Sequence, residues 1–138
     1  MTEQDKHLLL LDLKGRLKYG VKCIFHSKMG DIPAILVNVD YENGLIHIRP
    51  IEQNIVYCYF VEDNIAKPYL RPLKSMSSDE DHTWMLYRSR IVECNDDELD
   101  ENIAELHNWF NRKHFDYRGL IEKGLAIEVN ENNNPYTD

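Results

Sequence analysis

Residues 21–73 consist of short β-rich runs separated by turn residues, and this pattern limits the possible folds more than any other feature of the chain. Among the turns, Asn43-Gly44 is the strongest hairpin signal, because both residues tolerate positive φ. The segment 61–66 has the composition of a single helical turn and directly precedes the last run. The expected strands are residues 21–26, 35–40, 45–49, 56–60 and 67–73.

Five short strands with one helical turn before the fifth is the order of an SH3-like small β-barrel. A strongly bent antiparallel sheet would have the same order, and of the two alternatives we favour the barrel. Pro68 and Pro72 place the last run at a sheet edge or at positions that donate no hydrogen bond.

Apolar residues at helical spacing flank this β-rich region on both sides. They predict a helix over 3–13, a serine-capped helix that begins within 75–81, a second one over 97–113 and a closing strand over 125–129. The expected class is α+β: an N-terminal helical segment (1–15), an SH3-like β domain (16–74), a helical pair with a short closing strand (75–129) and a polar tail (130–138). We expect that tail to be frayed.

The net charge of −8 is distributed unevenly along the 138 residues. Residues 1–74 contain 10 Lys and Arg against 9 Asp and Glu, whereas residues 75–138 contain 6 against 15. General binding to phosphate backbones needs clustered positive charge, so this distribution argues against it and leaves room for a basic patch on the first half only.

Recognisable catalytic motifs do not occur in the sequence. It has no G-x-S-x-G elbow and no glycine-rich phosphate loop, and its paired carboxylates lie at a helix start. Cys23, Cys58 and Cys94 have no disulfide pattern, and we expect them to be mostly buried. Cys23 and His26 lack a second pair of ligands at metal-site spacing. We therefore expect a non-enzymatic cytoplasmic protein that has no metal or cofactor and does not bind membranes.

The stretch 114–129, HFDYRGLIEKGLAIEV, has a structural and a functional interpretation. In the structural one, Gly119 ends the preceding helix, Gly124 ends the turn 120–123, and Phe115 and Tyr117 pack on the helical pair. In the functional one, Asp116, Tyr117 and Arg118 form an exposed polar triplet that grips a partner, with Arg118 suited to a bidentate contact.

Three stretches resemble signatures of one family: DLKGRLKYGVKC (12–23), KPYLRPLKSM (67–76) and HFDYRGLIEKGLAIEV (114–129). The chain is similar to small uncharacterised proteins of Bacteroides-type phages and prophages, in which these strings recur in the same order. Lys18 departs from the family, which often has proline there. The resemblance implies a mobile-element origin and a role in the bacterial host cell, and it carries over no catalytic residue.

Together these features favour an accessory protein that binds another macromolecule, and the partner we expect is a host or phage protein. The expected surface joins segment 67–73 to turn 114–119, with Tyr69, Arg71, Tyr117 and Arg118 as contacts beside Asp116. The alternative is a small nucleic-acid-binding barrel that uses six cations, and a third possibility is an acidic nucleic-acid mimic that inhibits a host protein. The six cations are Lys14, Arg16, Lys18, Lys22, Lys67 and Lys74.

Overall fold

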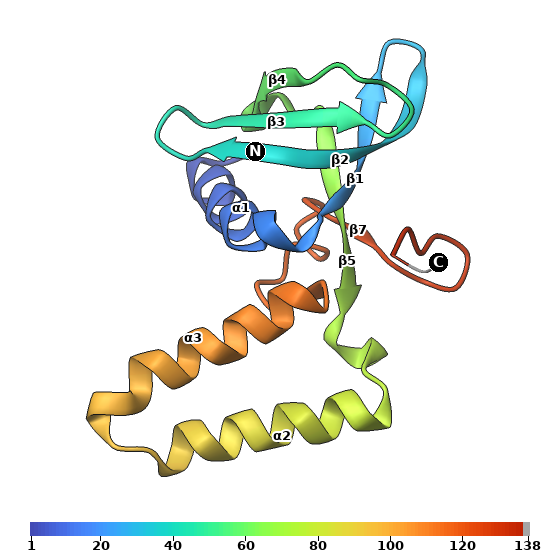
Figure 1. The fold of residues 1–138 in the computed structure, drawn as a ribbon. Coiled ribbons are helices and arrows are strands. Elements are labelled where there is room, and N and C mark those ends of the chain that lie inside the picture. Colours follow the sequence, from blue (N-terminus) through green and yellow to red (C-terminus); the bar gives the residue numbers. More distant parts are fainter. Residues whose placement is uncertain (137–138) are drawn as a thin grey trace.

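The computed structural model describes residues 1–136 of the chain, which fold as an α+β protein with seven strands in one mixed sheet and three α-helices (Figure 1). No helix among these residues is long and apolar enough to cross a membrane. The helices are α1 (Glu3–Arg16), α2 (Ser78–Glu93) and α3 (Asp96–Arg112). The strands are β1 (Lys22–Ser27), β2 (Gly30–Asp40), β3 (Leu45–Pro50), β4 (Tyr57–Phe60), β5 (Ala66–Pro72), β6 (Phe115–Asp116) and β7 (Ile127–Glu128).

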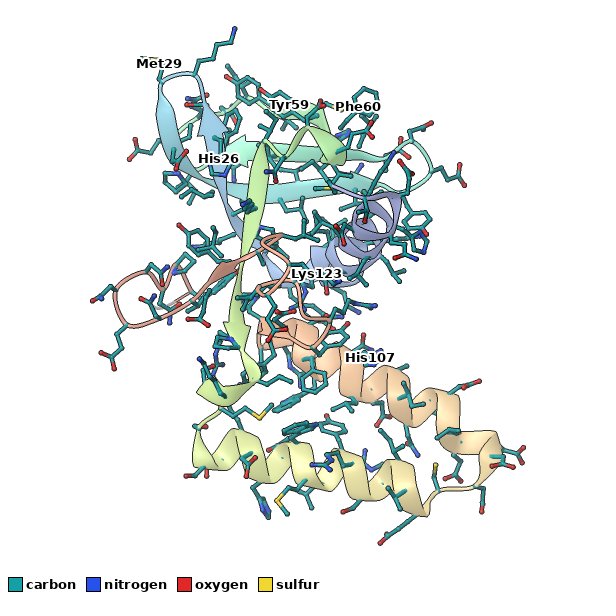
Figure 2. All side chains as sticks on the ribbon, turned by 180° about the vertical axis from the view of Figure 1, so that it is seen from behind. His26, Met29, Tyr59, Phe60, His107 and Lys123 are labelled. Atoms are coloured by element: carbon teal, nitrogen blue, oxygen red, sulfur yellow. The ribbon has the colours of Figure 1, made fainter. Side chains whose placement is uncertain are left out.

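The first five strands are antiparallel and follow the order β4-β3-β2-β1-β5. A 3-10 turn (η2, Val61–Asp63) separates β4 from β5, as the composition of 61–66 predicts. Phe25 of β1 lies against the rings of Tyr57 and Tyr59 of β4, with each pair of ring centroids 5.6 Å apart (Tyr59 is labelled in Figure 2). Since β1 and β4 are not neighbours in the strand order, these contacts show that the sheet curls.

The sheet is nevertheless not closed into a barrel, so the favoured closed form is wrong and the open, curled alternative describes β1–β5. Within residues 1–136, β4 pairs only with β3. β5 pairs with β1 and, in parallel, with the two short strands β6 and β7. Strands from the C-terminal helical region thus join the same sheet as the β-rich region.

Helix α1 is capped by Thr2 and covers the sheet with Leu9, Leu10 and Leu13, which are buried in the main core. It continues beyond residue 13, the expected end of this helix, runs through Gly15 and ends at Arg16. A Cβ at Gly15 would lie 3.2 Å from Nδ2 of Asn111 on α3, so the glycine permits the close approach of these two helices.

Helices α2 and α3 form a hairpin that extends away from the sheet (Figure 1). Ser77 caps α2 through a capping box with Glu80, as the serine-rich segment predicts. A second, aromatic core of Trp109, Phe110 and Phe115 forms where this hairpin meets β6. Tyr117 packs against it, which confirms the expected packing of 115 and 117 on the helices.

Candidate functional site

The two segments of the expected surface lie side by side in the structure. β5 pairs in parallel with β6, so that Arg71 is opposite Phe115 and Pro72 is opposite Asp116. The main-chain N–H of Arg71 donates to the carbonyl of His114 at 2.7 Å. The side chains of the two segments are, however, largely engaged within the chain.

Asp116 is a structural residue. Its side chain is buried, and its carboxylate accepts hydrogen bonds from the main-chain N–H groups of Leu120 at 3.0 Å and Ile121 at 2.9 Å. The N–H of Arg118 also donates to it, at 3.3 Å. The expectation of an exposed Asp116 is therefore wrong, because this carboxylate caps the turn 120–123, which Gly124 closes with φ +73°.

Arg118 and Arg16 both bind Asp12, which is completely buried in α1. The guanidinium of Arg16 contacts the two oxygens of Asp12 at 2.7 and 3.1 Å, and Nε of Arg118 lies 3.2 Å from Oδ1. Arg16 also donates to the carbonyl of Phe115. Since its exposed fraction is 0%, Arg16 has no surface to offer a nucleic acid, which corrects the expectation for this residue. We call Asp12, Arg16 and Arg118 the buried ion cluster.

Arg71 is held in place by two neighbours. Its guanidinium makes a bidentate ion pair with Glu80 of α2, at 2.9 and 2.7 Å, and lies 4.2 Å from the ring centroid of Phe115. The hydrogen bond from Arg71 lowers the pKa of Glu80 to about 2. Arg71 thus joins the helical hairpin to the sheet and still lines a groove with its remaining surface.

The other cations assigned to nucleic-acid binding do not form one patch. Lys14 is exposed and lies over the ring of Tyr41, at the β2–β3 hairpin, and the exposed Lys18 lies over Tyr19. Lys74 lines shallow hollows beside Leu73. Lys67 and Tyr69 are half-buried and alternate along β5 with buried residues, on the same side as Arg71. The half-buried Lys22 lies on the adjacent strand β1.

A groove of about 780 Å³ lies between the end of α3, β5 and the C-terminal segment. Its lining includes three cations and one carboxylate, that of Glu131. We call it the basic groove. Its lining residues are Arg71, Ser75, Arg112, Lys113, His114, Val129, Asn130, Glu131, Asn134 and Tyr136.

His114 and Tyr136 are stacked at this groove, with ring centroids 3.6 Å apart and planes within 9°. The hydroxyl of Tyr136 donates to the carbonyl of Tyr69 at 2.8 Å and accepts from the N–H of Lys22 at 3.1 Å, which bridges β1 and β5. The C-terminal segment is thus anchored as far as Tyr136, which corrects the expected fraying for 130–136; 137 and 138 lie outside the described residues.

The environment of His114 is positive. Burial lowers its pKa to about 4, and the charges of Arg16, Arg71 and Lys22 act in the same direction. The imidazole is therefore neutral near pH 7. His114 also ends α3, with φ +64°, so the helix closes there and not at Gly119 as expected.

Arg112 and Lys113 are the most accessible cations of the basic groove. Both are exposed, and within residues 1–136 neither has a carboxylate within ion-pair distance. Neither was singled out from the sequence, because the groove combines residues 71–75, 112–114 and 129–136. In the sequence, the feature that could have indicated this groove is Tyr136, an aromatic residue in the otherwise polar segment 130–138.

Cysteine chemistry does not involve this groove. Burial raises the pKa of the Cys23 thiol to about 12, so that thiol stays protonated. Cys58 on β4 is exposed, contrary to the expectation for the cysteines. Among residues 1–136, no three His, Cys, Asp or Glu side chains are grouped as a metal ion would need.

Comparison with models of protein families, with curated proteins and with solved structures gives no significant match for this chain.

Proposed function

We propose that this protein is a non-enzymatic binding protein that holds an acidic segment of another protein in the basic groove. The observation that carries the proposal is the pair Arg112 and Lys113, two exposed cations at the basic groove that make no ion pair among the described residues. In a chain of net charge −8, such a local positive potential steers an anionic group to one place. A bound segment would pack against three lining residues that are held in place within the chain, namely Arg71, His114 and Tyr136.

A protein partner fits this groove better than a nucleic acid does. On the side of the helical hairpin, a polyanion longer than the groove would meet residues 75–138, which contain 15 Asp and Glu against 6 Lys and Arg. A segment of a few acidic residues would place its charge inside the groove and avoid that repulsion. The volume of about 780 Å³ is in the range of pockets that bind small ligands.

Nucleic-acid binding is the second candidate, and one observation favours it. Lys22 and Lys67 lie on neighbouring strands, on the side of the sheet that carries Tyr69 and Arg71, and this surface extends from the groove. An acidic mimic of nucleic acid is the third candidate, supported by the exposed carboxylates of α3.

Two broader features belong to the same proposal. The strand order β4-β3-β2-β1-β5, with a 3-10 turn before β5, supports a relation to SH3-like domains despite the open sheet. The three signature stretches support a phage or prophage origin and a cytoplasmic place of action in the host cell.

The proposal is tested by affinity capture from bacterial lysate with three forms of the protein. These are the wild type, Arg112→Ala/Lys113→Ala, and the matched control Lys14→Ala/Lys28→Ala, which removes the same charge at exposed sites outside the groove. We expect one discrete protein to be retained by the wild type and the control after nuclease treatment, and to be lost from the groove variant. Retention that disappears with nuclease would instead support the nucleic-acid candidate.

A further inference from the structure

Helix α2 has an outer face that nothing covers within the described residues. The helix has no buried residue, and it packs against α3. Its inner face carries Trp84, Tyr87 and Ile91, while Met85, Leu86 and Val92 are 56, 55 and 83% exposed. Figure 1 shows α2 at the end of the molecule that is farthest from the sheet.

The apolar residues of this outer face belong to one helical stripe. At about 100° per residue, Met85 and Val92 lie on one side of the exposed Ser89 and Leu86 on the other, with His82 one turn before Leu86. Ser89 is small, so it would let a second helix approach closely. Exposed apolar side chains arranged in this way are typical of a helix–helix contact surface.

Charged residues border the stripe on both sides and are arranged for an antiparallel partner. Asp81 and Arg88 lie along one border, and Asp79 and Arg90 along the other. The two charged pairs, 81 with 88 and 79 with 90, are centred on the same point of the helix, between residues 84 and 85. In one antiparallel register, a copy of the helix therefore places Arg88 opposite Asp81 and Arg90 opposite Asp79.

The same register also matches the apolar positions. It brings Met85 to the two-fold axis, where it meets Met85 of the second copy, and sets Leu86 opposite the second copy's His82. Arg88 makes no ion pair within residues 1–136 and lies over the ring of Trp84. Arg90 pairs with the exposed Glu105 at 2.9 Å and lies over the ring of Tyr87. Two-fold contacts need a surface that is complementary to itself, and α2 has this property in both its charged and its apolar residues.

We propose that α2 is a homodimerisation surface on which two copies pair antiparallel about Met85. The partner is a second copy of this chain, because the acidic start and the basic end of the helix complement each other in a single register. The paired hairpins form a four-helix arrangement with the two sheets at opposite ends. The basic grooves lie outside this contact, so dimerisation presents two binding sites and is independent of what those sites bind.

The helix has 16 residues and is about 24 Å long, so the contact is small and its affinity is modest. Sedimentation equilibrium over a concentration series measures it. We expect the wild type to dimerise with a dissociation constant below about 100 μM. Met85→Glu, which puts two carboxylates at the axis, should weaken the dimer at least about tenfold.

Met29→Glu is the matched control, because Met29 is 97% exposed on the β1–β2 turn at the opposite end of the molecule (Figure 2). It should leave the dimer unchanged. Asp81→Arg should also weaken the dimer, and Asp81→Arg/Arg88→Asp should restore it by exchanging the two charges. Circular dichroism confirms that each variant retains its helices.

A wild type that stays monomeric at about 100 μM would overturn the proposal. So would a dimer that tolerates Met85→Glu as well as it tolerates Met29→Glu. Failure of the charge exchange to restore association would overturn the antiparallel register.

Discussion

Replacing Asp12 by Asn tests how the N-terminal helix and the turn after α3 are held together. The substitution keeps the shape of the side chain and removes its charge. Asp12 and Arg16 both have an exposed fraction of 0%, and Arg118 reaches the same carboxylate with 22% of its side chain exposed. The variant would therefore leave one fully buried guanidinium without a counter-charge.

The geometry gives the expected magnitude. Removing one partner of a buried ion pair costs about 3–5 kcal/mol, because the remaining charge stays desolvated. A guanidinium has only N–H donors, so an Asn amide N–H that faces it would find no acceptor there. Loss of the more exposed contact with Arg118 adds at most about 1 kcal/mol. Since the net stability of a domain is about 5–15 kcal/mol, Asp12→Asn should remove a large fraction of it.

Urea unfolding followed by tryptophan fluorescence and by circular dichroism provides the assay. Trp84 and Trp109 lie in the second core, so the fluorescence reports on the region that the buried ion cluster supports. Asp31→Asn is the control, since its side chain is 56% exposed and its 2.7 Å contact with His26 should be worth at most about 1 kcal/mol. Asp12→Leu/Arg16→Met should recover part of the loss. A loss below about 1 kcal/mol for Asp12→Asn would refute the reasoning.

Two further predictions concern the wall of the basic groove. Tyr136→Phe keeps the stacked ring but leaves the main-chain groups of Lys22 and Tyr69 without their partner, so the free energy of unfolding should fall by about 1–3 kcal/mol in urea titrations, and an unchanged value would show that the hydroxyl bridge is unimportant. His114, with a folded pKa of about 4 against an ordinary 6.5, takes up its proton first in the unfolded chain, so wild-type stability should decline as pH falls from 6.5 to about 4. His114→Asn, which tolerates positive φ, should lack this part of the decline, and identical pH profiles for the two proteins would contradict the assignment.

The strands and helices could be predicted from the sequence because their signals are local. The Asn43-Gly44 turn, the cap of α2 and the apolar spacing of α3 each act within a few residues. Local signals could not predict whether the sheet closes into a barrel, since closure depends on which strands pair with β4 and β5. In the structure β5 pairs with β6 and β7, which lie more than 40 residues further along the chain.

The site was harder to predict, because the chemistry of its residues depends on distant partners. Arg16 and Arg118 are residue types usually found at the surface, yet both bind the buried carboxylate of Asp12. Arg118 reaches it from about 100 residues further along the chain, and Arg16 donates to the carbonyl of Phe115 over a similar separation. Asp116 looked exposed beside Tyr117 and Arg118, and the turn that follows it uses its carboxylate. The groove itself requires the C-terminal segment to fold back onto β1 and β5 through Tyr136, and no local pattern indicates this.

The central claim, that the basic groove binds an acidic protein segment, is tested most directly by fluorescence anisotropy. The probe is a labelled peptide of alternating acidic and aromatic residues, and a single-stranded oligonucleotide of equal charge serves as the competitor. We predict that the peptide binds the wild type and Lys14→Ala/Lys28→Ala equally, that Arg112→Ala/Lys113→Ala weakens it at least about tenfold, and that the oligonucleotide competes poorly at physiological salt. Equal peptide binding by all three proteins, or displacement of the peptide by the oligonucleotide at low concentration, would contradict the account.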